Sequence, residues 1–205
     1  MKTEIVERKE LEKVEKCLKH GGVVAFPTDT VYGLGVMWDD EEALCRLKLS
    51  KGRPENKPIP MMISSIQQIH QVAYMDEKAE QLAHHFMPGG FTMILRKKEN
   101  IPDSVTNGFQ TIALRMPDDS FILKLIQNIG KPLLVTSANL SGMPTGVEFD
   151  QVRNDFDGNI DMIVKGECAK GVSSTIVDVS DNTVKMIREG LLTEKEILKV
   201  WEEAK

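Results

Sequence analysis

The sequence predicts one α/β domain in which a mixed β-sheet is covered by helices. Helical and strand patterns alternate along most of the 205 residues, as they do in sheets flanked by helices. Several late strand patterns follow one another with no helix between them, which favours a mixed sheet over a purely parallel one. The chain has 41% hydrophobic and 28% charged residues, an ordinary balance for a globular protein.

The N-terminal half opens with a helix and a strand. Apolar residues recur at helical spacing over residues 8–20, and Gly21 ends this helix. Residues 23–26 (VVAF) form an apolar strand that Pro27 breaks. Further along this half, we expect helices at 40–50, 65–73 and 76–86 and strands at 58–63 and 91–96.

The C-terminal half contributes mostly strands. Thr193 and Glu196 have the spacing of a capping box, so a last helix begins there and ends near Trp201. No repeat or linker-like tract divides the chain, and we expect a single domain over residues 1–205. The other elements expected in this half are a helix at 120–129 and strands at 111–115, 132–135, 162–164, 175–179 and 184–187.

Charge and cysteine usage narrow the class of protein. The net charge of -5 disfavours binding of nucleic acid over the whole surface, although a local basic patch is compatible with it. No apolar run has the length of a membrane span, and the charged N-terminus lacks the apolar centre of a signal peptide. Cys17, Cys45 and Cys168 have neither metal nor disulfide spacing. We therefore expect a cytoplasmic protein with free thiols and no membrane partner.

The common catalytic and nucleotide-binding fingerprints are missing. Neither GxGxxG after a strand nor GxxxxGK[ST] is present, and no nucleophile elbow supports Ser-His-Asp catalysis. The four histidines lack ligand spacing, so packing or surface roles suit them better than metal binding. We expect no covalent catalytic residue, and positioning and electrostatics would carry any chemistry.

Polar loops adjoin three of the predicted strands. Loops at strand ends form the ligand crevice of many α/β proteins, and glycines let backbone N–H groups approach an anion. Taken singly, each loop is better explained by ordinary turn and capping residues. The side chains concerned are Thr28, Asp29, Thr30, Ser137, Asn139, Ser141, Ser173, Ser174 and Thr175, with glycines at Gly33, Gly35, Gly142 and Gly171.

Basic residues concentrate between residues 46 and 57. Arg46 and Lys48 fit a helix C-terminus, where cations meet the helix dipole. Lys51, Arg53 and Lys57 follow in a loop bounded by Gly and Pro, where we expect little burial and a site for phosphates. Two further arginines end strands beside turn residues, and either Arg115 or Arg188 could clamp a carboxylate or phosphate.

Seven segments that contain these residues resemble the YrdC-domain family, the threonylcarbamoyl-AMP synthases. They occur in the family's order and together span nearly the whole chain, in its short, single-domain form. The segments are PTDTVYGLG (27–35), KGRPENKP (51–58), PGGFTMIL (88–95), TIALRMP (111–117), TSANLSG (136–142), GVSSTIVD (171–178) and IREG (187–190).

The resemblance implies a fold and a reaction. The fold is an α/β (α+β) one: a twisted, mixed, largely antiparallel sheet around a concave basic cavity. L-Threonine takes up bicarbonate or CO₂ to form a carbamate, which attacks the α-phosphate of ATP and releases pyrophosphate. Mg²⁺ is expected on the phosphates, without assigned protein ligands. A downstream tRNA threonylcarbamoyl-transferase would use the product to modify tRNA.

The resemblance also implies roles for individual residues. The ATP-binding set is Lys51, Arg53, Lys57, Thr111, Asn139 and Arg188. The threonine-binding set is Thr30, Tyr32, Arg115, Ser137 and Ser174. Met62 departs from the family pattern, which often has a threonine-binding His at this position. A relative that acts on another substrate is therefore an open alternative, as is a module that binds double-stranded RNA or tRNA without chemistry.

Overall fold

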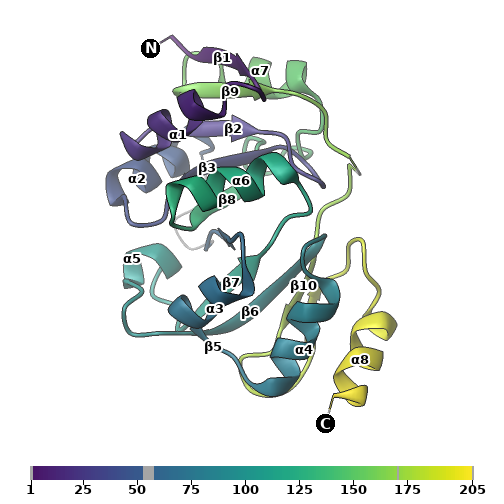
Figure 1. Ribbon diagram of the computed structural model, residues 1–205. Helices are drawn as coiled ribbons and strands as arrows, with labels where there is room; N and C mark the ends of the chain where they lie inside the picture. Colours follow the sequence, from purple (N-terminus) through teal and green to yellow (C-terminus); the bar gives the residue numbers. More distant parts are fainter. Residues whose placement is uncertain (1, 53–57, 170, 205) are drawn as a thin grey trace.

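The computed structural model describes residues 2–52, 58–169 and 171–204. Eleven strands of this part of the chain form one twisted sheet (Figure 1). Their order across the sheet is β1-β9-β2-β3-β8-β4-β7-β6-β10-β11, and β5 pairs with β6 outside this path. The strands are β1 (Glu4–Glu7), β2 (Val24–Phe26), β3 (Gly33–Met37), β4 (Met61–Met62), β5 (Ala73–Tyr74), β6 (Phe91–Lys97), β7 (Thr111–Arg115), β8 (Leu133–Ser137), β9 (Met162–Lys165), β10 (Thr175–Asp178) and β11 (Lys185–Arg188).

Strand directions confirm the prediction of a mixed, largely antiparallel sheet. Within the described residues, six strand pairings are antiparallel and four are parallel. The parallel pairs join segments that are distant in sequence, such as β6 with β10 and β4 with β7. These pairings bring the ends of strands from the whole chain together near the middle of the sheet.

Helices cover both faces of the sheet. α1 packs on α6, and their apolar side chains share one core cluster with alternate residues of β2, such as Val24 and Phe26. Ala25 points to the opposite face, where α2, α4 and α8 contribute to a second cluster, with α4 and α8 side by side (Figure 1). The helices are α1 (Leu11–Lys19), α2 (Glu41–Ser50), α3 (Ile66–Val72), α4 (Glu77–Phe86), α5 (Asp103–Thr106), α6 (Ser120–Ile129), α7 (Phe149–Phe156) and α8 (Glu194–Glu203).

Side-chain caps set several helix starts. Asp119 accepts hydrogen bonds from the amides of Phe121 and Ile122 at the start of α6. The capping box predicted for the last helix is confirmed: Thr193 and Glu196 exchange side-chain and backbone hydrogen bonds at the start of α8.

The polar loop expected after residues 23–26 is shorter than predicted, because Gly33 and Gly35 belong to β3. Gly33 and Gly35 pair with both β2 and β8, so their amides serve the sheet and not an anion. A Cβ atom at Gly35 would lie 2.9 Å from the ring of Phe26, so glycine is needed there for close packing. Four further elements were not predicted: β1, β5, α5 and α7. The helix predicted over residues 8–20 begins later, at Leu11, because the chain leaves β1 through a turn.

Candidate active site

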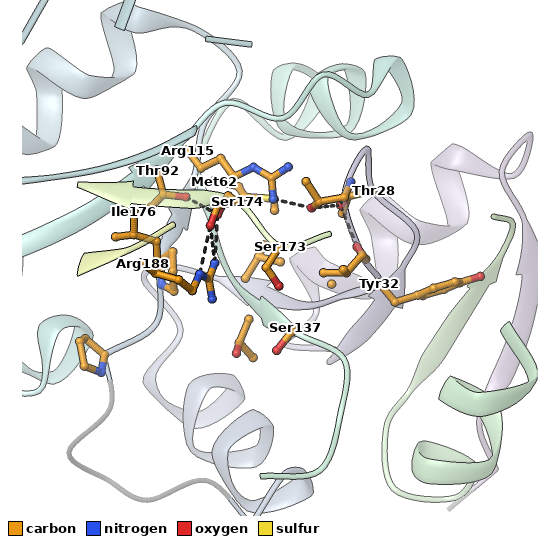
Figure 2. A pocket seen from close by; sticks show the side chains of 17 residues that line it. Thr28, Tyr32, Met62, Thr92, Arg115, Ser137, Ser173, Ser174, Ile176 and Arg188 are labelled. Carbon is orange, nitrogen blue, oxygen red and sulfur yellow. Dashed lines mark hydrogen bonds between the residues drawn. The ribbon is translucent and has the colours of Figure 1, made fainter. Parts of the chain in front are cut away.

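A cavity of about 230 Å³ lies among the strand ends near the middle of the sheet. Its wall combines hydroxyl groups, two arginines and several apolar side chains (Figure 2). Three of the polar loops and strand ends that were expected to form a crevice therefore meet at one place. The lining residues are Thr28, Thr30, Val31, Tyr32, Gly33, Pro58, Pro60, Met62, Thr92, Arg115, Val135, Thr136, Ser137, Ser173, Ser174, Ile176 and Arg188.

Arg115, the last residue of β7, is held by three hydrogen bonds. Its Nε donates to the Gly89 carbonyl at 3.1 Å, and Nη1 donates to Thr30 Oγ1 at 2.8 Å. Nη2 lies 2.5 Å from Oδ1 of Asp29, and both side chains of this ion pair are buried. Burial lowers the pKa of Arg115, and Asp29 counteracts that shift. The guanidinium therefore has one fixed orientation at the cavity wall.

Thr30 owes its position to the loop between β2 and β3. The hydroxyl of Thr28 donates to the Val31 carbonyl at 2.8 Å and accepts from the Thr30 amide at 3.2 Å. These bonds close a tight turn in which Thr30 is fully buried beside Arg115.

Arg188 reaches the cavity from the end of β11. Its Nε and Nη2 donate to the Ser174 carbonyl at 3.1 and 2.8 Å. A Cβ atom at Gly190 would lie 2.3 Å from the Ser173 carbonyl oxygen, so glycine permits this close approach. Burial lowers the pKa of Arg188, and the charge of Arg115 lowers it further. Two cations thus share one cavity, which favours an anionic ligand.

Thr92 is a cavity residue that the sequence did not indicate. It is buried in β6, and its hydroxyl lies 2.8 Å from the Ser174 hydroxyl (Figure 2). The parallel pairing of β6 with β10 creates this contact, since Thr92 lies opposite Ile176. A threonine within a strand has no distinguishing local signal, because threonine is common in strands.

Ser137, Asn139 and Lys51 form one connected group at the end of β8. Ser137 Oγ donates to Asn139 Oδ1 at 2.6 Å, and Asn139 Nδ2 donates to the carbonyls of Leu140 and Met143. Lys51 Nζ donates to the Ser137 carbonyl, while the Ser141 amide donates to the Lys51 carbonyl at 2.9 Å. Lys51 is only 2% exposed, so the expectation of little burial there was wrong. The reason is that both its side chain and its carbonyl bond to the segment at the end of β8.

The structure brings some of the expected site residues together and leaves others apart. Thr30, Arg115, Ser137, Ser174 and Arg188 line the cavity, whereas Lys51 and Asn139 lie behind Ser137. Arg53 and Lys57 lie outside the described residues.

Two expected residues do not present their side chains to the cavity. Tyr32 turns its ring away from the Arg115–Ser174–Arg188 group (Figure 2), and its hydroxyl donates to the Val164 and Gly166 carbonyls. Thr111 begins β7 and lies about 13 Å along the strand from Arg115, at roughly 3.3 Å per residue. It is not among the residues that line the cavity, because β7 presents only its C-terminal end there.

Comparisons with known proteins identify the family and agree with the fold. Residues 16–190 match the family model Sua5_yciO_yrdC, described as telomere recombination. The chain belongs to this family. It is 41% identical over 185 residues to a Pyrococcus abyssi protein named threonylcarbamoyl-AMP synthase, covering 89% of this chain and 54% of that one. A Bacillus subtilis protein of the same name is 39% identical over 183 residues, covering 88% and 53%. The chain thus spans about half the length of these curated relatives.

Solved structures of family members have the same fold. Pyrococcus abyssi Sua5 in complex with L-threonine matches with a TM-score of 0.91 and 38% identity, over 98% of this chain and 61% of that one. Escherichia coli YciO matches with a TM-score of 0.87 over 96% of this chain and 100% of that one. Its identity is 23%, so this likeness shows the fold alone.

Two further features are absent from the described residues. No helix among them combines the length and apolar character needed to cross a membrane. No group of three or more His, Cys, Asp or Glu side chains among them could hold a metal ion.

Proposed function

We propose that the chain is a threonylcarbamoyl-AMP synthase, a nucleotidyltransferase that joins L-threonine, bicarbonate or CO₂, and ATP. The observation that carries this proposal is the cavity in which Thr30, Arg115 and Ser174 meet Arg188. A family member of the same fold was solved with L-threonine bound, and curated relatives carry the name of this enzyme.

The cavity residues divide into two groups in this proposal. Arg115 binds the carboxylate of threonine through charge-assisted hydrogen bonds, and the hydroxyls of Thr30, Ser137 and Ser174 contact the rest of the amino acid. Arg188 serves the nucleotide, together with Lys51 and Asn139 behind Ser137 and with Arg53 and Lys57, which lie outside the described residues. The backbone at Tyr32 belongs to the threonine side. Thr111 is not among the residues that line this cavity, and its assignment to the nucleotide rests on the family resemblance alone.

Catalysis would depend on the positioning of the two substrates and on electrostatic stabilisation of the phosphates. The amino nitrogen of threonine first bonds to the carbon of CO₂ and loses a proton, which gives a carbamate; bicarbonate gives the same carbamate with release of water. A carbamate oxygen then bonds to the α-phosphorus of ATP, while the bond from that phosphorus to the pyrophosphate oxygen breaks. The lysines and arginines offset the negative charge that builds up on the phosphates.

Magnesium enters this proposal as part of the substrate. Magnesium bound to a nucleotide usually takes most of its ligands from phosphates and water, so no protein ligand is assigned to it. The product would pass to a tRNA threonylcarbamoyl-transferase in the cytoplasm. Three free cysteines suit that compartment.

The test is mass spectrometry of protein mixed with ATP, magnesium, bicarbonate and L-threonine. We expect threonylcarbamoyl-AMP and pyrophosphate in equal amounts, with little of either when serine replaces threonine or bicarbonate is omitted. Arg115→Met should lose the product, whereas Arg46→Met, a cation outside the cavity wall, should keep it. Release of ADP and phosphate in place of pyrophosphate would contradict the proposed reaction.

Met62 supports a second candidate, the same reaction on a different amino acid. Its side chain lines the cavity and is 5% exposed, so an apolar group stands where many family members have His. Supplying each amino acid in turn and measuring pyrophosphate release separates the two candidates. A larger response to an amino acid other than threonine, reversed by Met62→His, would favour the second.

A further inference from the structure

Asp29 is a buried carboxylate that the sequence placed only among turn residues. It is 3% exposed, and its Oδ1 lies 2.5 Å from Nη2 of Arg115. Its other oxygen, Oδ2, is buried and accepts no hydrogen bond within the described part of the chain. A buried oxygen without a donor costs free energy. Stability alone therefore does not explain why a carboxylate stands at this position.

The hydrogen bonds of Arg115 to the described residues leave two of its N–H groups available to a ligand. A guanidinium has five N–H groups. Within the described residues, the Nε–H group donates to Gly89, one Nη1–H group donates to Thr30 and one Nη2–H group donates to Asp29. One N–H remains on Nη1 and one on Nη2. Two donors on the terminal nitrogens of a guanidinium suit the two oxygens of one carboxylate.

Asp29 also offsets positive charge at the cavity. Arg115 and Arg188 lie close enough for the charge of one to lower the pKa of the other. Asp29 offsets one of these two charges from behind the guanidinium, since it is not itself part of the cavity wall. Arg115 can thus keep its orientation beside a second cation before any ligand arrives.

We propose that Asp29 is a positioning residue for the amino-acid substrate: with Thr30 and Gly89 it fixes the Arg115 guanidinium so that its two remaining N–H groups meet the substrate carboxylate. This inference rests on the proposed function. Holding the donors in place before binding removes an ordering cost that would otherwise weaken affinity.

The direction in which Asp29→Asn changes L-threonine affinity distinguishes a positioning role of Asp29 from a purely electrostatic one. The substitution keeps the shape of the side chain and raises the net positive charge of the cavity. Charge alone therefore predicts tighter binding of an anionic ligand. A positioning role predicts the opposite, because an amide holds the guanidinium less firmly than a carboxylate does.

The experiment is isothermal titration of the full chain with L-threonine and, separately, with ATP and magnesium. Asp29→Asn should weaken L-threonine binding about tenfold or more, while ATP affinity stays within about twofold. In an Arg115→Lys background, Asp29→Asn should change L-threonine affinity by less than about twofold, because the two substitutions remove one interaction. Asp161→Asn is the matched control, since Asp161 also lies 2.5 Å from an arginine but outside the cavity, and it should leave both affinities unchanged.

Each other outcome counts against the inference. Unchanged or tighter L-threonine binding by Asp29→Asn would overturn it, and so would equal losses for L-threonine and ATP, which indicate general damage. If Asp29→Asn does not fold, Asp29→Glu takes its place; it keeps the charge, shifts the guanidinium and should weaken L-threonine selectively. A wild-type protein that binds ATP but no L-threonine would refute the proposed function itself, and this inference with it.

Discussion

The Arg115–Asp29 and Arg46–Asp161 pairs have the same length and very different surroundings. In both, a guanidinium Nη2 lies 2.5 Å from a carboxylate oxygen. The side chains of Arg115 and Asp29 are 7% and 3% exposed, whereas those of Arg46 and Asp161 are 40% and 26% exposed. Distance alone would rank the two pairs as equal, but burial makes the loss of one partner far more costly in the first.

The additional hydrogen bonds of each ion pair indicate its role. Asp161 also accepts a hydrogen bond from the Val23 amide at 2.7 Å, and Arg46 donates to the Gly21 carbonyl at 3.1 Å. This exposed pair connects α2 to the start of β2 and to the turn before β9. The buried pair leaves one carboxylate oxygen and two guanidinium N–H groups unused beside a cavity. The remaining polar groups of the exposed pair can reach solvent, whereas those of the buried pair are shielded from it.

Asp29→Ala should cause the largest change in stability. It leaves Arg115 buried without its countercharge, which costs about 3–5 kcal/mol of the free energy of unfolding. Asp161→Ala should cost only about 1–2 kcal/mol, because its pair is partly solvated. Urea unfolding of both variants measures the difference. Equal losses would show that burial does not distinguish the pairs.

Arg115→Ala should weaken L-threonine binding by about 2–4 kcal/mol, since a desolvated carboxylate would lose its partner. Titration calorimetry provides the measurement, and Arg46→Ala is the control with no expected change in affinity. If Arg115→Ala binds L-threonine as the wild type does, the carboxylate is held by another group.

Lys51→Met extends the comparison from arginine to lysine. Lys51 is 2% exposed and donates to the Ser137 carbonyl, so its loss should lower the free energy of unfolding by about 1–3 kcal/mol. Lys131, whose side chain is 54% exposed and pairs with Asp39 at 2.6 Å, is the matched control. Lys131→Met should cost less than about 1 kcal/mol in the same unfolding assay.

The smallest predicted effect concerns a thiol near the exposed pair. Burial, and then the negative charge of Asp161, raise the pKa of Cys17 to about 11. At pH 8 its thiolate fraction is therefore small, and Cys17 should react with iodoacetamide more slowly than the exposed Cys45. Asp161→Asn removes a charge that raises this pKa, so Cys17 should react faster. Peptide mass spectrometry reports both rates, with Cys45 as the internal reference.

Local patterns predicted most of the helices and the mixed sheet. α7 was missed although Phe149, Val152 and Phe156 have helical spacing, so the signal was present in the sequence. β1 and β3 carried weaker signals. Only Val6 of β1 is buried, and β3 begins Gly-Leu-Gly, residues that form a strand because β2 and β8 flank them.

The candidate site was predictable where residue chemistry stands out and not where it depends on packing. Arg115, Arg188, Ser137 and Ser174 were indicated by charge, by loop position and by family resemblance. Asp29 could not be separated from ordinary turn residues, because its partner lies 86 residues further along the chain. The same holds for Thr92, whose contact with Ser174 depends on the register between β6 and β10.

The pairing of β6 with β10 also determines when during synthesis the site can exist. Phe91 lies opposite Thr175, and contacts between such distant segments form late in folding. A nascent chain that ends before residue 173 lacks Ser173, Ser174 and Arg188, and it leaves residues 91–94 of β6 unpaired on the side opposite β7. Incomplete translation products therefore cannot sequester ligand, and their open strand edge exposes them to chaperones and proteases.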